Sequence, residues 1–191
     1  MGFAKNWLEE LVSEWLSLEG YSVETNVPLK SKSGGGRNEA DVLGFMFKGE
    51  GIEIVHAEAT VQLTGSHEEN IRKIREKFSQ GNSEAVLNIA MIKYGGMRVD
   101  KKRNIFVSAL PSSTNESEKL KAELSKTIEF INFQELIGKC TGAIKEYAEG
   151  EKIGSMDRPS AKIFAALPDS LWFMKMLGMF KMYPDFKIFG K

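Results

Sequence analysis

Two acidic residues in apolar stretches of the chain constrain its fold more than any other feature. Asp41 and Glu58 each stand among apolar neighbours, in segments whose alternating pattern predicts β-strands. A carboxylate in such a strand is costly unless it is paired, hydrogen-bonded or bound to a metal. The two acids lie on successive strands, and together they therefore predict a site for a divalent cation.

Composition limits the function classes that need to be considered. The chain has 191 residues, of which 42% are hydrophobic and 27% charged, as in an ordinary globular protein. Its formal net charge is zero, so a nucleic-acid partner would have to be met by local basic patches. Cys140 is the single cysteine, which excludes an intramolecular disulfide and a cysteine-based zinc site and favours a reducing, cytoplasmic compartment. The charged N-terminal segment does not resemble a signal peptide, and no apolar run approaches the roughly 20 residues of a membrane span.

Hydrophobic periodicity predicts an α/β domain over residues 1–150. Residues 39–47 and 52–63 are expected to pair as an antiparallel hairpin, and a helix between the third and fourth strands implies a right-handed crossover in a mixed sheet flanked by helices. The expected helices are 3–19, 66–80, 118–126 and 133–149, and the expected strands are 21–29, 39–47, 52–63, 85–92, 104–110 and 127–131. Loops are expected at 30–37, which contains three consecutive glycines, and at 98–103, which is basic.

Residues 151–191 form an apolar extension that is rich in methionine and phenylalanine and interrupted by prolines. A segment of this length cannot build a core of its own. We expect it to form helical structure that packs either on the main domain or on a second subunit, in which case the chain is a homodimer. A helix lying on a membrane would need a clean polar face, and Lys175 and Lys181 supply only part of one.

Side chains of the third strand alternate between its two faces. One face is apolar, and the other presents four polar residues, namely His56, Glu58, Thr60 and Gln62. Two interpretations stay open for these residues. The polar face is either exposed to solvent or covered by the helix that follows, which would make it a functional site. Asp41, at the start of the second strand, is either part of that site or a turn residue that caps the glycine loop.

The element order, with an acid opening the second strand and a glutamate in the third, resembles the PD-(D/E)XK nuclease superfamily, closest to its Mrr-type restriction endonuclease-like members. The resemblance covers residues 5–145, including the first helix with Glu9 to Leu16 and the closing stretch Thr127 to Leu136. It implies a restriction endonuclease-like fold and a Mg²⁺- or Mn²⁺-dependent endonuclease that hydrolyses DNA phosphodiester bonds, of the restriction or DNA repair and recombination type.

Carried over by position, the resemblance implies that Asp41, Glu58, the carbonyl of Ala59 and Glu9 would be the metal ligands. If the register of the first helix slips by one residue, Glu10 replaces Glu9. Hard oxygen ligands suit Mg²⁺, which would polarise the phosphoryl group and lower the pKa of the attacking water.

Thr60 stands where the family carries a lysine, and three explanations stay open. The lysine is supplied by the following helix, where Lys73 is the first candidate and Lys77 the second. Alternatively, Gln62 or His56 orients the water. In the third case the site is degenerate, and the chain is a nucleic-acid-binding or assembly module. A fourth interpretation, a small-molecule or protein interaction domain, needs no nucleic-acid partner.

Two basic clusters are predicted to contact the nucleic-acid backbone. The first flanks the glycine loop and consists of Lys30, Lys32 and Arg37. The second occupies the expected basic loop and consists of Arg98, Lys101, Lys102 and Arg103. In both cases the alternative is a solvated loop without a partner.

Overall fold

The computed structural model describes residues 6–31, 37–110, 114–151 and 166–182. The elements occur in the order α1 (Trp7–Leu18), β1 (Ser22–Ser31), β2 (Arg37–Lys48), β3 (Gly51–Gln62), α2 (His67–Lys77), α3 (Gln80–Lys93), β4 (Arg98–Leu110), α4 (Thr114–Leu124), β5 (Glu129–Asn132), α5 (Phe133–Gly150) and α7 (Trp172–Met182).

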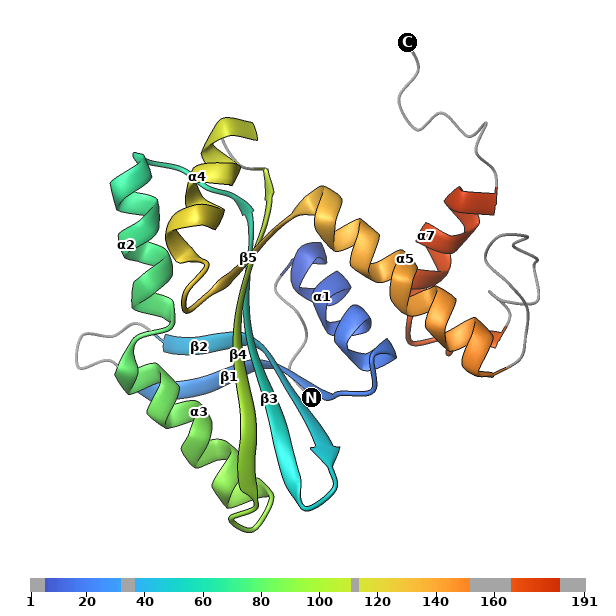
Figure 1. The fold of residues 1–191 in the computed structure, drawn as a ribbon, viewed down its shortest axis with the longest axis horizontal. Coiled ribbons are helices and arrows are strands. Elements are labelled where there is room, and N and C mark those ends of the chain that lie inside the picture. Colours follow the sequence, from blue (N-terminus) through green and yellow to red (C-terminus); the bar gives the residue numbers. More distant parts are fainter. Residues whose placement is uncertain (1–5, 32–36, 111–113, 152–165, 183–191) are drawn as a thin grey trace.

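The five strands form one mixed sheet in the order β1-β2-β3-β4-β5. The first three strands are antiparallel, while β3, β4 and β5 are parallel. Helices α2, α3 and α4 cover one face of the sheet, α1 and α5 cover the other, and α7 lies outside α1 and α5 (Figure 1). The predicted α/β class, the mixed sheet and the β2–β3 hairpin are therefore confirmed. Within the described ranges, no helix has the length and apolar character needed to cross a membrane.

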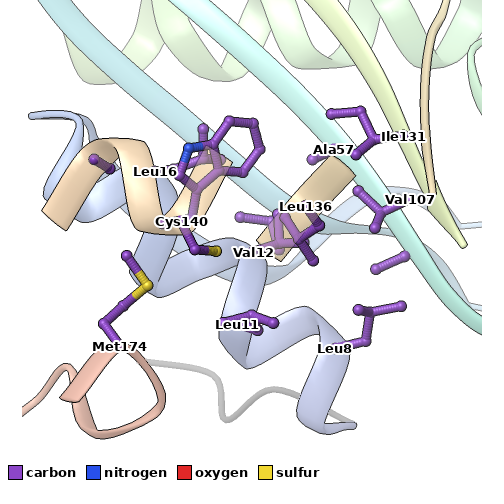
Figure 2. Packing of buried hydrophobic residues seen from close by; sticks show 14 of the residues in the cluster. Leu8, Leu11, Val12, Leu16, Ala57, Val107, Ile131, Leu136, Cys140 and Met174 are labelled. Atoms are coloured by element: carbon purple, nitrogen blue, oxygen red, sulfur yellow. The ribbon is translucent and has the colours of Figure 1, made fainter. Parts of the chain in front are cut away.

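Helix α1 anchors the larger core because its apolar residues recur three and four positions apart. The helix begins at a cap, where the side chain of Asn6 accepts the backbone N–H groups of Leu8 and Glu9. Its inward residues meet the apolar side of β3 and the neighbouring strand β4 (Figure 2). They are Leu8, Leu11, Val12, Trp15 and Leu16, all at most 2% exposed. Each such side chain stabilises the fold by roughly 1.5–3 kcal/mol relative to an exposed position.

The strand predicted at residues 85–92 is wrong, because this segment lies inside helix α3. The buried residues of this segment lie on one face of the helix. Ala85, Val86 and Ala90 are buried, whereas Met91 and Ile92 are 55% and 86% exposed. A short continuous apolar run does not distinguish a buried strand from a helix, so the sequence pattern is ambiguous at this point. As a consequence, the crossover between β3 and β4 contains two helices instead of one.

The basic loop predicted at residues 98–103 is also wrong, because these residues form the first half of β4. The chain turns just before them at Gly95 and Gly96, whose φ angles of 66° and 77° suit glycine. The strand begins earlier than its apolar pattern indicates, since its first half carries charged side chains. Helix α4 likewise begins at Thr114, within the stretch between the predicted strand 104–110 and the predicted helix 118–126.

Helix α7, in the C-terminal extension, packs against α1 and α5. Leu167, Leu171 and Met174 are buried in the same core as α1. The carboxylate of Glu14 accepts the backbone N–H groups of Phe173 at 3.1 Å and Met174 at 2.8 Å, so it caps the start of α7. The described part of the extension thus packs on the main domain, and the homodimer stays a prediction.

Candidate functional site

A cavity of about 380 Å³ lies beside β3 at the point where its pairing with β2 ends. The last paired residues are Val42 and Ala57. Beyond them the side chain of Asp41 takes the place of the backbone ladder, because its Oδ2 accepts the N–H of Ala59 at 2.9 Å. Glu58, the other acid predicted from the sequence, also lines this cavity. The two carboxylates therefore share one pocket.

Asp41 is mostly buried, and burial raises its pKa to about 7, with the negative charge of Glu58 adding to the effect. The hydrogen bond from Ala59 and the charge of Lys77 act in the opposite sense. A pKa this close to neutral pH makes the protonated form of Asp41 accessible. The carboxyl group can then donate a hydrogen bond as well as accept one.

Glu58 is 1% exposed and is held by two partners. One oxygen lies 2.9 Å from Nε2 of His56, and the other forms an ion pair of 2.6 Å with Nζ of Lys77. Burial alone would lower the pKa of Lys77, but the charge and hydrogen bond of Glu58 outweigh it and raise that pKa. The ring of His56 is itself buried and meets Phe78 edge-on at 4.8 Å. The part of the polar face that carries His56 and Glu58 is thus covered, whereas Gln62 on the same face is exposed to solvent.

Helix α2 supplies the opposite wall of the pocket. It begins at Ser66, whose side chain accepts the N–H of Glu69, and it buries Ile74 against the sheet. Asn70, Ile74 and Lys77 follow one another at spacings of four and three, so they lie on one face of the helix. All three line the cavity. The phase of α2 therefore determines which of its side chains enter the site.

Asn70 is a polar pocket residue that sequence reasoning missed. It is 1% exposed, yet neither its amide nitrogen nor its amide oxygen has a hydrogen-bond partner among the described residues. A buried amide without partners costs about 1–3 kcal/mol. Its spacing of four from Ile74 is a signal in the sequence that this polar side chain faces inward.

The remaining site residues predicted in α1 and β3 also line the cavity. Glu9 is 3% exposed, and its carboxylate accepts the side-chain N–H of Asn6 at 2.5 Å. Thr60 lies on the wall, and its hydroxyl donates to the carbonyl of Gln62 at 3.2 Å. Ala59 contributes its N–H to Asp41. The structure thus brings together the predicted site residues of α1, β2 and β3.

The two candidate lysines of α2 have different surroundings. Lys73, the first candidate, lines the cavity but forms an ion pair of 2.7 Å with Glu69 on its own helix. Lys77, the second candidate, lies one turn further along and reaches Glu58. The cation nearest to the acidic pair is therefore Lys77.

The acids of the pocket, predicted as metal ligands, each have protein partners in this structure. Within the described ranges, no group of three or more histidine, cysteine, aspartate or glutamate side chains is placed to hold one. Lys77 already occupies one oxygen of Glu58, and Ala59 occupies one oxygen of Asp41. No metal centre is therefore found among the described residues, and the predicted Mg²⁺ or Mn²⁺ cofactor stays a prediction.

The first basic cluster falls largely outside the described residues. Lys32 is not described at all, and for Lys30 and Arg37 the structure describes the backbone, in β1 and β2 respectively. Contacts of these three residues with nucleic acid stay a prediction.

The second basic cluster is divided by the alternation of β4. Arg98 pairs with Asp100 at 2.6 Å, Lys101 lies 3.8 Å from Glu53, and Arg103 pairs with Glu129 at 2.8 Å. Lys102 points to the opposite side of the strand from Lys101. The cluster therefore does not form one basic surface, because a strand sends consecutive side chains to different faces.

Comparisons with known proteins found no matching family model and no matching curated protein. A solved structure that is similar to this chain is the Acinetobacter baumannii Cap4 SAVED/CARF-domain containing receptor with the cyclic trinucleotide 2'3'3'-cAAA. The sequence identity is 11% and the TM-score is 0.41. The similarity covers 96% of this chain and 42% of the receptor, so the chain spans less than half of that protein's length.

These findings correct the family prediction. The structure found is described as a cyclic-trinucleotide receptor, and no match to the PD-(D/E)XK nuclease superfamily or its Mrr-type members was found. The predicted restriction endonuclease-like family is therefore wrong, and so is the function of a metal-dependent DNA endonuclease, which rested on it. The confirmed part is the α/β fold with its mixed sheet.

Proposed function

We propose that this chain is a nucleic-acid-binding module whose pocket beside α2 holds an unpaired base. The observation that carries the proposal is the buried carboxamide of Asn70, which lines the pocket with both its donor and its acceptor unpartnered among the described residues. An asparagine amide offers the donor–acceptor pair that matches the edge of a base, and adenine is its usual partner.

The remaining walls of the pocket suit a base better than a phosphate. Ile74 and Phe106 supply apolar surface for the flat faces of a base. Asp41, whose pKa is raised to about 7, can donate to a ring nitrogen when protonated or accept from an exocyclic amino group when ionised. A phosphate would instead meet the carboxylates of Glu9 and Glu58. An exposed base edge is found in single strands, loops and bulges, so we expect single-stranded nucleic acid to bind more tightly than a duplex.

Fluorescence polarisation with labelled single-stranded and duplex oligonucleotides tests the proposal. We expect Asn70→Leu to weaken single-strand binding about tenfold or more, because one bidentate contact to a base is lost. The same change removes a buried amide without partners and keeps the side-chain size, so the variant should be at least as stable as the wild type.

The matched control is Asn115→Leu, the same substitution at an exposed position of α4. It should leave affinity unchanged. Absence of binding to every oligonucleotide, or equal affinity of the wild type and Asn70→Leu, would overturn the proposal. Measuring thermal stability alongside affinity separates loss of the contact from loss of the fold.

A further inference from the structure

A second cavity, of about 310 Å³, lies where the first half of β4 meets β5 and the turn after α4. Its walls include Lys102, Lys121, Lys126 and the ring of Phe130. That ring is stacked on Phe106 with centroids 6.1 Å apart, and Phe106 lines the pocket beside α2. The two cavities therefore lie on the same side of β4, with this pair of rings between them.

The second cavity has more positive than negative groups. Four of its lining residues are basic, namely Lys102, Arg103, Lys121 and Lys126, and the acid is Glu129. Arg103 pairs with Glu129, which also binds Lys139 at 3.0 Å, and Lys121 pairs with Glu135. Within the described ranges, Lys102 and Lys126 have no carboxylate within ion-pair distance. Two ammonium groups of this cavity are thus free to meet an anion.

Lys102 is the more informative of the two because it is partly buried. Burial lowers the pKa of its ammonium group, and no neighbouring acid among the described residues offsets this effect. Its neighbour Lys101, on the other face of the strand, has the carboxylate of Glu53 at 3.8 Å. Even a partly buried cation is less favourable without a counter-ion, and a bound anion would supply one.

We propose that this cavity, here called the Lys102–Lys126 site, binds a phosphate group. Two lysines lining one cavity match the charge of a phosphate, and lysine binds phosphate as a point charge without needing a fixed fork of donors. The site does not rest on the base-binding function proposed above, since none of its side chains contacts Asn70 or Asp41 through an observed hydrogen bond or ion pair. The phosphate belongs either to a nucleic-acid backbone or to a small phosphorylated molecule.

Isothermal titration calorimetry with inorganic pyrophosphate at low ionic strength tests the Lys102–Lys126 site. We expect saturable binding by the wild type and a loss of about tenfold or more in Lys102→Gln and in Lys126→Gln, since each removes one charge-assisted contact. The matched control is Lys101→Gln, the same substitution one residue away on the opposite face of β4, and it should bind like the wild type. Thermal stability is recorded for each variant to confirm folding.

Two results would overturn the proposal, namely absence of saturable pyrophosphate binding and an equal loss in Lys101→Gln, which would indicate general charge attraction. A competition arm identifies the source of the phosphate. Displacement of a bound oligonucleotide by pyrophosphate supports a backbone phosphate, whereas binding without displacement supports a small phosphorylated ligand. Asn70→Leu should retain pyrophosphate binding, so failure of the base pocket and failure of the Lys102–Lys126 site give different results.

Discussion

Replacing Asp41 with asparagine should stabilise the protein at alkaline pH. The pKa of Asp41 is raised from 3.8 to about 7, chiefly by burial and then by the charge of Glu58. A carboxyl group with a raised pKa favours folding below its unfolded-state pKa, and this contribution is lost as pH rises through the folded-state value. The penalty of the ionised form is therefore complete above about pH 8.

The size of the effect follows from the shift. A difference of about 3 pKa units corresponds to about 4 kcal/mol at the rate of about 1.4 kcal/mol per unit. The amide oxygen introduced by Asp41→Asn can still accept the N–H of Ala59, but the charge of the acceptor is lost, which costs about 1 kcal/mol. We therefore expect a net gain of about 3 kcal/mol near pH 8.5 and a change of less than about 1 kcal/mol near pH 4, where Asp41 is protonated in the folded chain and partly protonated in the unfolded chain.

Urea denaturation followed by tryptophan fluorescence at the two pH values measures this gain. The matched control is Asp100→Asn, which removes an exposed carboxylate of β4 and should change the free energy of unfolding by less than about 0.5 kcal/mol. If Asp41→Asn lowers the stability near pH 8.5, or if its gain is the same at both pH values, the assignment of Asp41 as a strained buried acid is refuted.

Three further predictions concern the contacts around this pocket and the C-terminal helix. Lys77→Met leaves Glu58 buried without its cation and should lower the free energy of unfolding by about 3–5 kcal/mol. The control Arg72→Met, on the exposed side of α2, should change it by less than about 1 kcal/mol, and urea denaturation of both variants checks this. Two glutamates of α4 bind the ring of His67 and raise its pKa. At pH values below about 6.5, His67→Gln should therefore lower the melting temperature, and the difference from the wild type should vanish as pH rises through the folded-state pKa. A difference that does not depend on pH would contradict this. Glu14→Ala removes the cap of α7 and should speed amide hydrogen exchange at the start of that helix, and unchanged exchange there would show that apolar packing alone holds it.

Much of the fold could be predicted because its signals are local. Alternation of side chains in β3 predicts one apolar and one polar face, and the structure places α1 on the first and α2 on the second. The tight turn at residues 48–51 predicts the hairpin that brings Asp41 near Glu58. Helix α3 could not be predicted, because a short and almost continuously apolar run fits either element type until its neighbours show which side is covered.

The composition of the site was less predictable, because it depends on how α2 lies over the sheet. Lys73 and Lys77 are one turn apart on the same helix, so helical periodicity treats them alike. The position of α2 along β3 determines that Lys77 meets Glu58 while Lys73 pairs with Glu69. The same placement buries Asn70 in the pocket, where neither of its amide atoms finds a partner among the described residues.

By itself, the sequence determined an α/β domain with a mixed sheet and a pair of acids on adjacent strands, because alternation, helical spacing and turn residues act over a few positions. Only the tertiary structure decided that Glu58 is paired with Lys77 and Asp41 with a backbone amide, and no metal centre is found among the described residues. It also decided that Lys102 and Lys126 line a second cavity. Those outcomes depend on distances between elements far apart in the chain. Such distances are determined by the packing of whole helices on the sheet, and local sequence patterns do not predict them.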